Sequence, residues 1–322
     1  MIDIIGVPFD LCGKRLGSRL GPAALRLAGL NQVLHDLHVE VNDMGDLDSG
    51  VESTQPGGLR NFEPLLGCLK ELKARVRESL QSHSIPVVLG GDHSLPIASV
   101  AAALEVYEGD IALLWIDAHA DLNTPGTSST GNIHGMPVAA LQRLESGVGG
   151  VADVQWSQLL SSVVPHQALS PERCAWYGLR DVDPLEGLRI RQTPGDLAIT
   201  MHDVDRRGVV ETIAWFDQWM KESGARHLWI SFDVDALDPI LAPGTGTAVR
   251  GGLSYRESHL VAELLRECLD ARDCPYRLIG LDLVETNPLF DSNNETAKMA
   301  VEWVGSLFGK TILGGKSPQG GQ

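Results

Sequence analysis

The stretch Ile111-Ala-Leu-Leu-Trp-Ile116 runs directly into Asp117-Ala-His-Ala-Asp121, so an apolar segment ends in a group of alternating polar residues. A short, continuous apolar run is typical of a strand that is buried on both faces of a parallel sheet. Two other apolar runs end in the same manner, and they lead into Gly90-Gly-Asp-His-Ser94 and Ser231-Phe-Asp-Val-Asp235. In an open parallel sheet, ligands bind outside the carboxyl ends of the strands. We therefore expect the three polar segments to meet in one crevice.

These polar segments carry the donor atoms of a divalent-cation site. The candidate ligands are His93, Asp117, His119, Asp121, Asp233 and Asp235. Alternation along each segment puts its ligands on one side, and unpaired carboxylates that meet in a protein interior are costly unless cations join them. Six ligands exceed the four of a tetrahedral zinc site, and none of the five cysteines lies in these segments. The set favours two manganese ions that share carboxylates, with iron, cobalt or nickel as alternatives.

Composition limits the classes of protein that the chain can represent. Its 322 residues are 43% hydrophobic and carry a formal net charge of −16, which argues against a nucleic-acid partner. The negative charge would attract a cationic substrate, although it also accounts for simple solubility. We expect no transmembrane span, because no apolar stretch approaches about 20 residues. The five cysteines show no pairing pattern, and the start of the chain has no signal-peptide pattern, so we expect a cytoplasmic protein.

Apolar strand candidates alternate with amphipathic helices along the chain, which predicts an α/β fold with a mainly parallel sheet and helices on both faces. The expected strands are 2–8, 39–46, 86–91, 111–117, 174–180, 227–234 and 277–285. The expected helices are 21–38, 61–83, 95–106, 136–145, 207–223, 254–270 and 293–309. No linker divides this pattern. We therefore expect a single three-layer domain over residues 1–312, followed by a flexible tail over residues 313–322.

Three local patterns add detail to this outline. Ser254-Tyr-Arg-Glu257 is a capping-box pattern, and Asn294 is expected to cap the last helix. The stretch from Gly147 to Pro171 is rich in glycine, serine and proline, and we expect it to be the longest loop.

The three polar segments resemble the metal motifs of the ureohydrolases, a family of arginases, agmatinases and related amidine hydrolases. The likeness extends from Ile5-Gly-Val-Pro-Phe9 to about Phe308, which is nearly the whole chain. It is greatest to the arginases, through Asp121-Leu-Asn-Thr-Pro125, Thr130-Gly-Asn-Ile-His-Gly135, Arg180-Asp-Val-Asp-Pro-Leu-Glu186 and Val284-Glu-Thr-Asn-Pro288. The resemblance implies an arginase-like fold and hydrolysis of L-arginine to L-ornithine and urea.

The resemblance also implies how two manganese ions per subunit are held. The first ion is assigned His93, Asp117, Asp121 and Asp233. The second ion is assigned His119, Asp117, Asp233 and Asp235, so that Asp117 and Asp233 bridge the pair. A hydroxide between the ions then attacks the guanidinium carbon, and Asp121 passes its proton to the leaving nitrogen.

Further residues match positions that contact substrate in the family. Glu285 pairs with the guanidinium, Thr247 lines the site, and His134 serves as a proton shuttle or general acid. The neutral donors for an α-carboxylate are Asn123, Thr130 and Asn132. The acidic groups for an α-ammonium are Asp181, Asp183 and Glu186. One departure is that Thr130 stands where arginases usually carry serine, which keeps the hydroxyl but adds a methyl group.

Three alternatives stay open at this point. Another ureohydrolase would act on agmatine, guanidinobutyrate or a hydroxyarginine. A deacetylase-like amide hydrolase would use a single zinc ion, which the presence of both His93 and His119 disfavours. A non-catalytic arginine-binding protein would be expected to have lost a ligand, and no ligand is lost.

The resemblance further implies assembly as a homotrimer or homohexamer. Asp205 and Arg256 match positions that form an ion pair between subunits in trimeric relatives.

Overall fold

One eight-stranded sheet forms the centre of the molecule. The computed structural model describes residues 1–53 and 55–313. The strands are β1 Ile2–Val7, β2 Val41–Asp46, β3 Ile85–Gly90, β4 Ala112–Ile116, β5 Cys174–Leu179, β6 Leu197–Thr200, β7 His227–Asp233 and β8 Arg277–Val284. They lie in the order β2-β1-β3-β8-β7-β4-β5-β6, and every pair of neighbours is parallel. The expectation of a mainly parallel sheet is confirmed.

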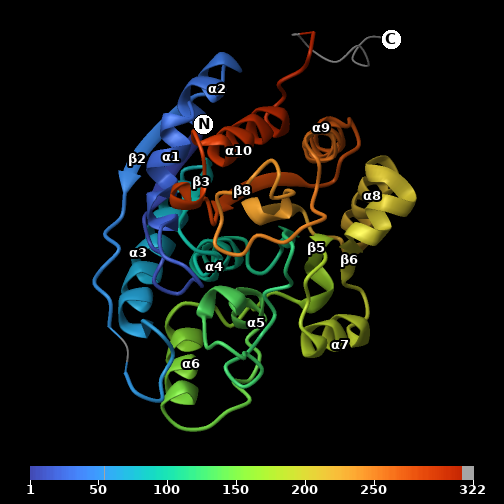
Figure 1. Cartoon of the computed structure of the whole chain (residues 1–322). Coiled ribbons are helices and arrows are strands. Elements are labelled where there is room, and N and C mark those ends of the chain that lie inside the picture. The colour runs from blue at the N-terminus through green and yellow to red at the C-terminus, as the bar shows by residue number, and fades with distance from the viewer. Residues whose placement is uncertain (54, 314–322) are drawn as a thin grey trace.

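Helices cover both faces of this sheet (Figure 1). They are α1 Gly21–Leu27, α2 Leu30–Asp36, α3 Phe62–Gln81, α4 Pro96–Val106, α5 Pro137–Leu141, α6 Val151–Ser162, α7 Pro184–Gln192, α8 Met201–Ser223, α9 Tyr255–Asp270 and α10 Glu295–Leu307. Helices α3 to α6 share one apolar core with the sheet, and α1, α2, α8, α9 and α10 share the other. The three-layer α/β arrangement is therefore confirmed. None of the helices in the part of the chain that is described has the length and apolar character that a membrane crossing requires.

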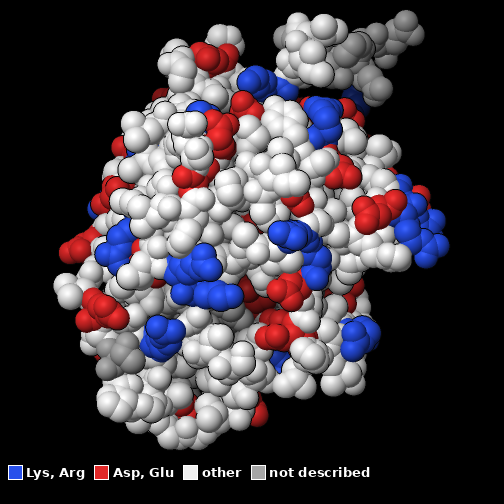
Figure 2. Space-filling view, viewed as in Figure 1, with Lys and Arg blue, Asp and Glu red and all other residues white. Residues whose placement is uncertain are grey.

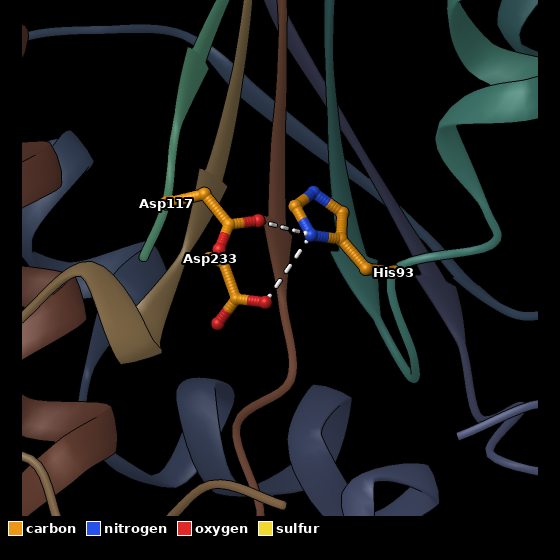
Figure 3. Close-up of side chains that lie close together, drawn as sticks. All are labelled: His93, Asp117 and Asp233. Carbon is orange, nitrogen blue, oxygen red and sulfur yellow. Dashed lines mark ion pairs between the residues drawn. The ribbon is translucent and has the colours of Figure 1, made fainter. Parts of the chain in front are cut away.

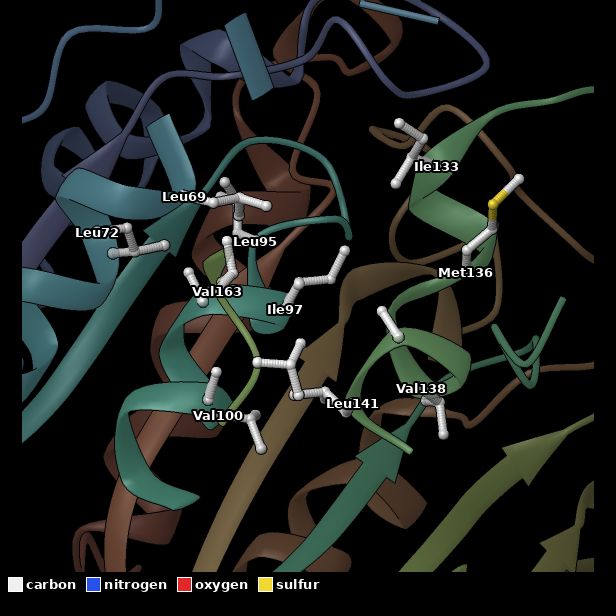
Figure 4. Close-up of a cluster of buried hydrophobic side chains, with 14 of the residues drawn as sticks. Leu69, Leu72, Leu95, Ile97, Val100, Ile133, Met136, Val138, Leu141 and Val163 are labelled. Atoms are coloured by element: carbon white, nitrogen blue, oxygen red, sulfur yellow. The ribbon is translucent and has the colours of Figure 1, made fainter. Parts of the chain in front are cut away.

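The two cores follow from the period of two along each strand. Leu113 and Trp115 of β4 face the first core, whereas Leu114 and Ile116 face the second. Figure 4 shows part of the first core, in which side chains of α3, α4 and α5 pack against one another. Each fully buried aliphatic side chain contributes about 1.5–3 kcal/mol to stability relative to an exposed one. The buried strands hold the polar segments at their ends in fixed positions.

Several expected elements differ in the structure. The expected helix 21–38 is two helices, because Gly29 between them has a left-handed φ of 93°. The expected helix 136–145 is confined to α5. The pattern missed α7 and the short edge strand β6, whose residues are mostly half-buried and show no strong apolar run.

The stretch from Gly147 to Pro171 was expected to be a loop, and this expectation is wrong. It contains α6, whose Trp156 and Leu159 are buried in the first core. The helix forms because tertiary packing of these side chains outweighs a composition that is weakly helical by itself.

The two capping predictions had different outcomes. Ser254 accepts from Glu257 N at 3.3 Å and the Glu257 carboxylate accepts from Ser254 N at 2.8 Å, so the capping box is confirmed. Asn294 is at the N-cap position of α10, but its side chain makes no cap hydrogen bond. Its Nδ2 instead donates to the Ala24 carbonyl at 2.8 Å, which ties α10 to α1. Of the expected tail, residues 314–322 lie outside the described residues.

Candidate metal centre

The carboxyl ends of four adjacent strands, β3, β8, β7 and β4, bring the candidate ligands together. His93 follows β3, Glu285 follows β8, Asp233 ends β7, and Asp117 follows β4. A Cβ at Gly91 would lie 2.0 Å from the Phe9 carbonyl oxygen, so only glycine allows the chain to pass there on its way to His93. Sequence position hides this grouping, because β8 comes last in the chain yet lies between β3 and β7.

His93 is the centre of the first group of ligands. Its Nδ1 lies 2.9 Å from Asp117 Oδ2 and 3.2 Å from both Asp121 Oδ2 and Asp233 Oδ2. Figure 3 shows the imidazole and two of these carboxylates pointing toward one another. The ring is fixed by stacking on Trp115 at 3.9 Å and by a contact of 2.9 Å between Nε2 and Ser231 Oγ. Among the described residues, Nδ1 is buried and makes no well-aligned hydrogen bond, which is the condition expected of a nitrogen that binds a metal.

His119 belongs to a second group that shares Asp117 with the first. Its Nδ1 lies 3.3 Å from Asp117 Oδ1 and 3.2 Å from Asp235 Oδ2. The ligand atoms of His93, Asp117 and Asp233 lie within 4.8 Å of one another, and so do those of Asp117, His119 and Asp235. Two of the oxygens that face the imidazoles are also oriented by hydrogen bonds, since Thr247 Oγ1 donates to Asp235 Oδ2 at 2.7 Å and Trp115 Nε1 donates to Asp117 Oδ2 at 2.9 Å. Such outer contacts fix the direction of metal ligands.

Within the cluster, the carboxylates outnumber the groups that could carry a compensating positive charge. Burial raises the pKa of Asp233 well above its ordinary value, and it raises the pKa of Asp121 to about 6. Burial acts in the same direction on Asp117, but hydrogen bonds from His119 and His93 outweigh it and hold the pKa of Asp117 below its usual range. Four carboxylates and two imidazoles without a thiolate fit a pair of divalent cations that prefer oxygen and nitrogen.

A cavity of about 230 Å³ opens above the cluster and collects most of the predicted site residues. It is lined by Lys14, His93, His119, Asp121, Asn123, Ser128, Ser129, Thr130, Asn132, His134, Gly135, Asp181, Asp183, Glu186, Asp233 and Thr247. Asp117, Asp235 and Glu285 are buried just beneath this lining. A larger cavity of about 570 Å³ is lined mainly by apolar side chains and contains none of the predicted site residues.

Glu285 connects the floor of the cavity to His134. Its Oε1 accepts from the His93 backbone N–H at 3.1 Å and lies 2.9 Å from His134 Nδ1. Glu285 adopts a left-handed φ of 62°, an uncommon conformation for a non-glycine residue and one that recurs at functional sites. Burial opposes protonation of His134, but the contact with Glu285 raises its pKa above the ordinary value. His134 can therefore hold a proton at the cavity.

Two of the predicted substrate residues, Asn123 and Glu186, already make hydrogen bonds to other residues of the chain. Asn123 Nδ2 donates to Asp183 Oδ2 at 2.9 Å, and Asn123 Oδ1 accepts from Thr127 Oγ1 at 2.8 Å. Glu186 accepts from Leu122 N at 2.7 Å through one oxygen and from Asp183 N at 3.0 Å through the other. Glu186 therefore ties the start of α7 to the segment that carries the candidate ligands after β4, and both of its oxygens already accept hydrogen bonds.

Sequence reasoning did not name as site residues four residues that line the cavity, namely Lys14, Ser128, Ser129 and Gly135. The two serines are part of the hydroxyl-rich run Thr127-Ser-Ser-Thr130, and this run was a signal that could have included them. Lys14 lies in the loop after β1, a strand whose carboxyl end lies at the same edge of the sheet.

Comparisons with known proteins point in one direction. The sequence model of a family described as "Arginase family" matches residues 1–309. An arginase of Staphylococcus aureus (strain MRSA252) is 40% identical over 317 residues, covering 97% of this chain and 98% of that protein. An arginase of Bacillus caldovelox is also 40% identical over 317 residues, covering 97% and 99%. The structure of Bacillus caldovelox arginase superposes with a TM-score of 0.85 at 38% identity and covers 97% of this chain and 99% of the other.

Proposed function

The chain belongs to the arginase family of amidine hydrolases, and we propose that it hydrolyses L-arginine to L-ornithine and urea at a centre of two manganese ions. The observation that carries this proposal is the pair of ligand groups that share Asp117 beneath a polar cavity. The cavity lining includes acidic groups as well as amide and hydroxyl donors, as a ligand with both an ammonium and a carboxylate requires.

The proposed ligands of the first ion are His93, Asp117, Asp121 and Asp233. The proposed ligands of the second are His119, Asp117, Asp233 and Asp235. When bound, divalent cations supply a strong water-derived nucleophile near neutral pH and stabilise the charge that develops during hydrolysis. Manganese suits this donor set because it accepts carboxylates together with a few imidazoles.

Residues of the chain orient the guanidinium and move its protons. Glu285 uses Oε1 for His93 and His134, so Oε2 is the oxygen that can accept from the guanidinium. Asp121 lines the cavity beside His93, where its carboxylate can take a proton from the attacking water and deliver it to the leaving amine. His134 turns Nδ1 toward Glu285, which leaves Nε2 as the ring atom that exchanges a proton with the departing product.

The far end of the substrate meets the outer wall of the cavity. Asp181 is exposed over 69% of its side chain and lies 3.8 Å from His119 Nε2, so its charge is open to an α-ammonium. Asp183 stands beside it at the start of α7. Thr130 and Asn132 face the same cavity and can donate to an α-carboxylate.

A side-by-side kinetic comparison tests the assignment. Manganese-loaded protein is assayed with L-arginine, agmatine and 4-guanidinobutyrate under identical conditions. A site built to hydrogen-bond a group rejects ligands that lack it, so we expect kcat/KM for L-arginine to exceed that for agmatine by about 100-fold or more. An equal or higher value for agmatine would leave the family unchanged and would overturn the choice of substrate.

A further inference from the structure

We propose that Arg60 is a positioning residue that orients the Asn132 amide and thereby selects substrates that carry an α-carboxylate. The inference rests on the proposed function and extends it to a residue outside the cavity lining. Arg60 Nη1 donates to Asn132 Oδ1 at 2.8 Å. Asn132 is 5% exposed and lines the cavity above the metal centre.

The contact fixes which way the Asn132 amide is turned. A guanidinium carries only donors, so the amide oxygen must face Arg60 and the amide nitrogen must take the opposite position. The reverse orientation would place N–H groups against N–H groups. An amide can either donate or accept, whereas a carboxylate only accepts hydrogen bonds. With its oxygen held by Arg60, Asn132 presents its N–H groups and can donate to a carboxylate.

Asn132 matters because the neighbouring donors are already engaged. Asn123 gives an N–H of its amide to Asp183 and accepts from Thr127, so its orientation is set toward the acidic wall. Thr130 Oγ1 accepts from the Asn132 backbone N–H at 3.2 Å, which places the hydroxyl next to Asn132, and it lies 3.5 Å from Ser128 Oγ. Recognition of the carboxylate therefore depends on Asn132 and Thr130, and Arg60 controls the first of these.

Arg60 is exposed, but both of its neighbours in the chain are buried and hydrogen-bonded. Leu59 N donates to Gln155 Oε1 at 2.6 Å, and Asn61 Nδ2 donates to the Leu11 carbonyl at 2.7 Å. Leu59 and Asn61 are 4% and 3% exposed, respectively. A side chain that starts from a fixed backbone loses less conformational freedom when it orients a partner, so Arg60 can act as a preorganised donor.

The charges around the cavity agree with this assignment. Arg60 brings positive charge next to Asn132, whereas Asp181 and Asp183 bring negative charge to the side of α7. An α-amino acid carries its carboxylate and its ammonium on one carbon, and charges of the opposite sign lie near the cavity for both groups.

The test compares ligands with and without the carboxylate. Arg60→Ala and Arg60→Lys are assayed with L-arginine and agmatine, and their binding of L-ornithine and 1,4-diaminobutane is measured by calorimetry on the manganese-loaded protein. The matched control is Arg77→Ala, an exposed arginine on α3 that pairs with Glu105 on the protein surface. Melting temperatures check that each variant is folded.

For Arg60→Ala we expect KM for L-arginine and Kd for L-ornithine to rise about tenfold, the usual scale for loss of one oriented hydrogen bond. We expect kcat to change much less, and agmatine and 1,4-diaminobutane to be unaffected. Arg60→Lys keeps a donor and should recover part of the loss, while Arg77→Ala should match the wild type. In an Asn132→Ala background, Arg60→Ala should have little further effect, because Arg60 acts through Asn132.

Three results would overturn the proposal: equal effects on ligands with and without the carboxylate, no effect on either, or additive effects of Arg60→Ala and Asn132→Ala. Failure of the wild type to hydrolyse L-arginine would contradict the proposed function instead. The calorimetric comparison still decides the role of Arg60 in that case, because it does not depend on turnover.

Discussion

At the scale of single residues, Glu285 contacts both His134, the proposed proton carrier, and the backbone of His93, a proposed metal ligand. Glu285 Oε1 contacts both His93 N and His134 Nδ1, so the same carboxylate positions the His134 ring and the backbone beside the proposed metal centre. Loss of His134 should therefore impair proton transfer more than it impairs the metal site.

We predict that His134→Ala lowers kcat by about 10²–10⁴-fold, the usual cost of losing a general acid. Metal content and KM for L-arginine should stay close to those of the wild type, because His134 is not among the proposed ligands. The wild-type kcat should also fall as pH rises above the ordinary histidine range, since the proton on His134 is lost as pH passes through its raised pKa. Steady-state kinetics as a function of pH and elemental analysis check both points. A variant with wild-type turnover would show that His134 has only a structural role.

The candidate ligands could be proposed from the sequence, because each of them lies at the end of a buried strand or shortly after it. The structure groups His93, Asp117 and Asp233, and it groups His119 with Asp117 and Asp235. The partners of the substrate residues could not be predicted. The contacts of Asn132 with Arg60 and of Glu186 with Leu122 join positions 72 and 64 residues apart, and no local pattern encodes them.

At the scale of elements, the turn after β3 determines whether His93 can reach the cluster. Gly91 passes so close to Phe9 that a methyl group would meet the Phe9 carbonyl oxygen at 2.0 Å. The obstacle is backbone, which cannot rotate away as a flexible side chain could.

We predict that Gly91→Ala destabilises the fold by about 1–3 kcal/mol or more, the range for overpacking in a tight site. The control is Gly67→Ala in α3, where nothing lies within 4 Å of the added methyl group. Alanine in that exposed helix position should stabilise by about 0.5–1 kcal/mol. Thermal unfolding of the two metal-free variants against the wild type measures both effects. A melting temperature for Gly91→Ala equal to that of the wild type would show that the added methyl group does not clash with the Phe9 carbonyl oxygen.

The elements that could be predicted are formed by contacts between residues close in sequence, whereas the elements that were missed depend on contacts with distant residues. The capping box of α9 involves residues three apart, and its prediction is confirmed. Helix α6 depends on contacts of Trp156 and Leu159 with a core built from distant parts of the chain, so composition alone predicted a loop there. The short strand β6 exists because β5 offers it a paired edge.

At the scale of the whole molecule, Asp205 and Arg256 lie on the neighbouring helices α8 and α9 and are both exposed. Within one chain, Arg256 makes only a loose ion pair with Glu263 at 3.4 Å and keeps 60% of its side chain exposed. Figure 2 shows both signs of charge interspersed on one face, so complementary pairing between copies does not have to overcome a uniform acidic surface there.

We propose assembly as a trimer or hexamer and predict that Arg256→Asp shifts it toward smaller species. The reversed charge would repel the Asp205 of a neighbouring subunit, and the fork of arginine that matches a carboxylate would be lost. Light scattering at micromolar concentration measures the change, with Arg77→Ala as a control for loss of an exposed arginine. The dissociated variant should keep some activity, since the described cavity is built within one chain. A monomeric wild type would refute the assembly.

The metal content of the dialysed protein tests the central claim most directly. After loading with manganese and extensive dialysis, the wild type should retain about two ions per chain by elemental analysis, because the two ligand groups share Asp117. His119→Asn should lose mainly one ion, and Asp233→Ala should lose both. One tightly held ion or fewer in a fully active wild type would contradict the two-metal centre.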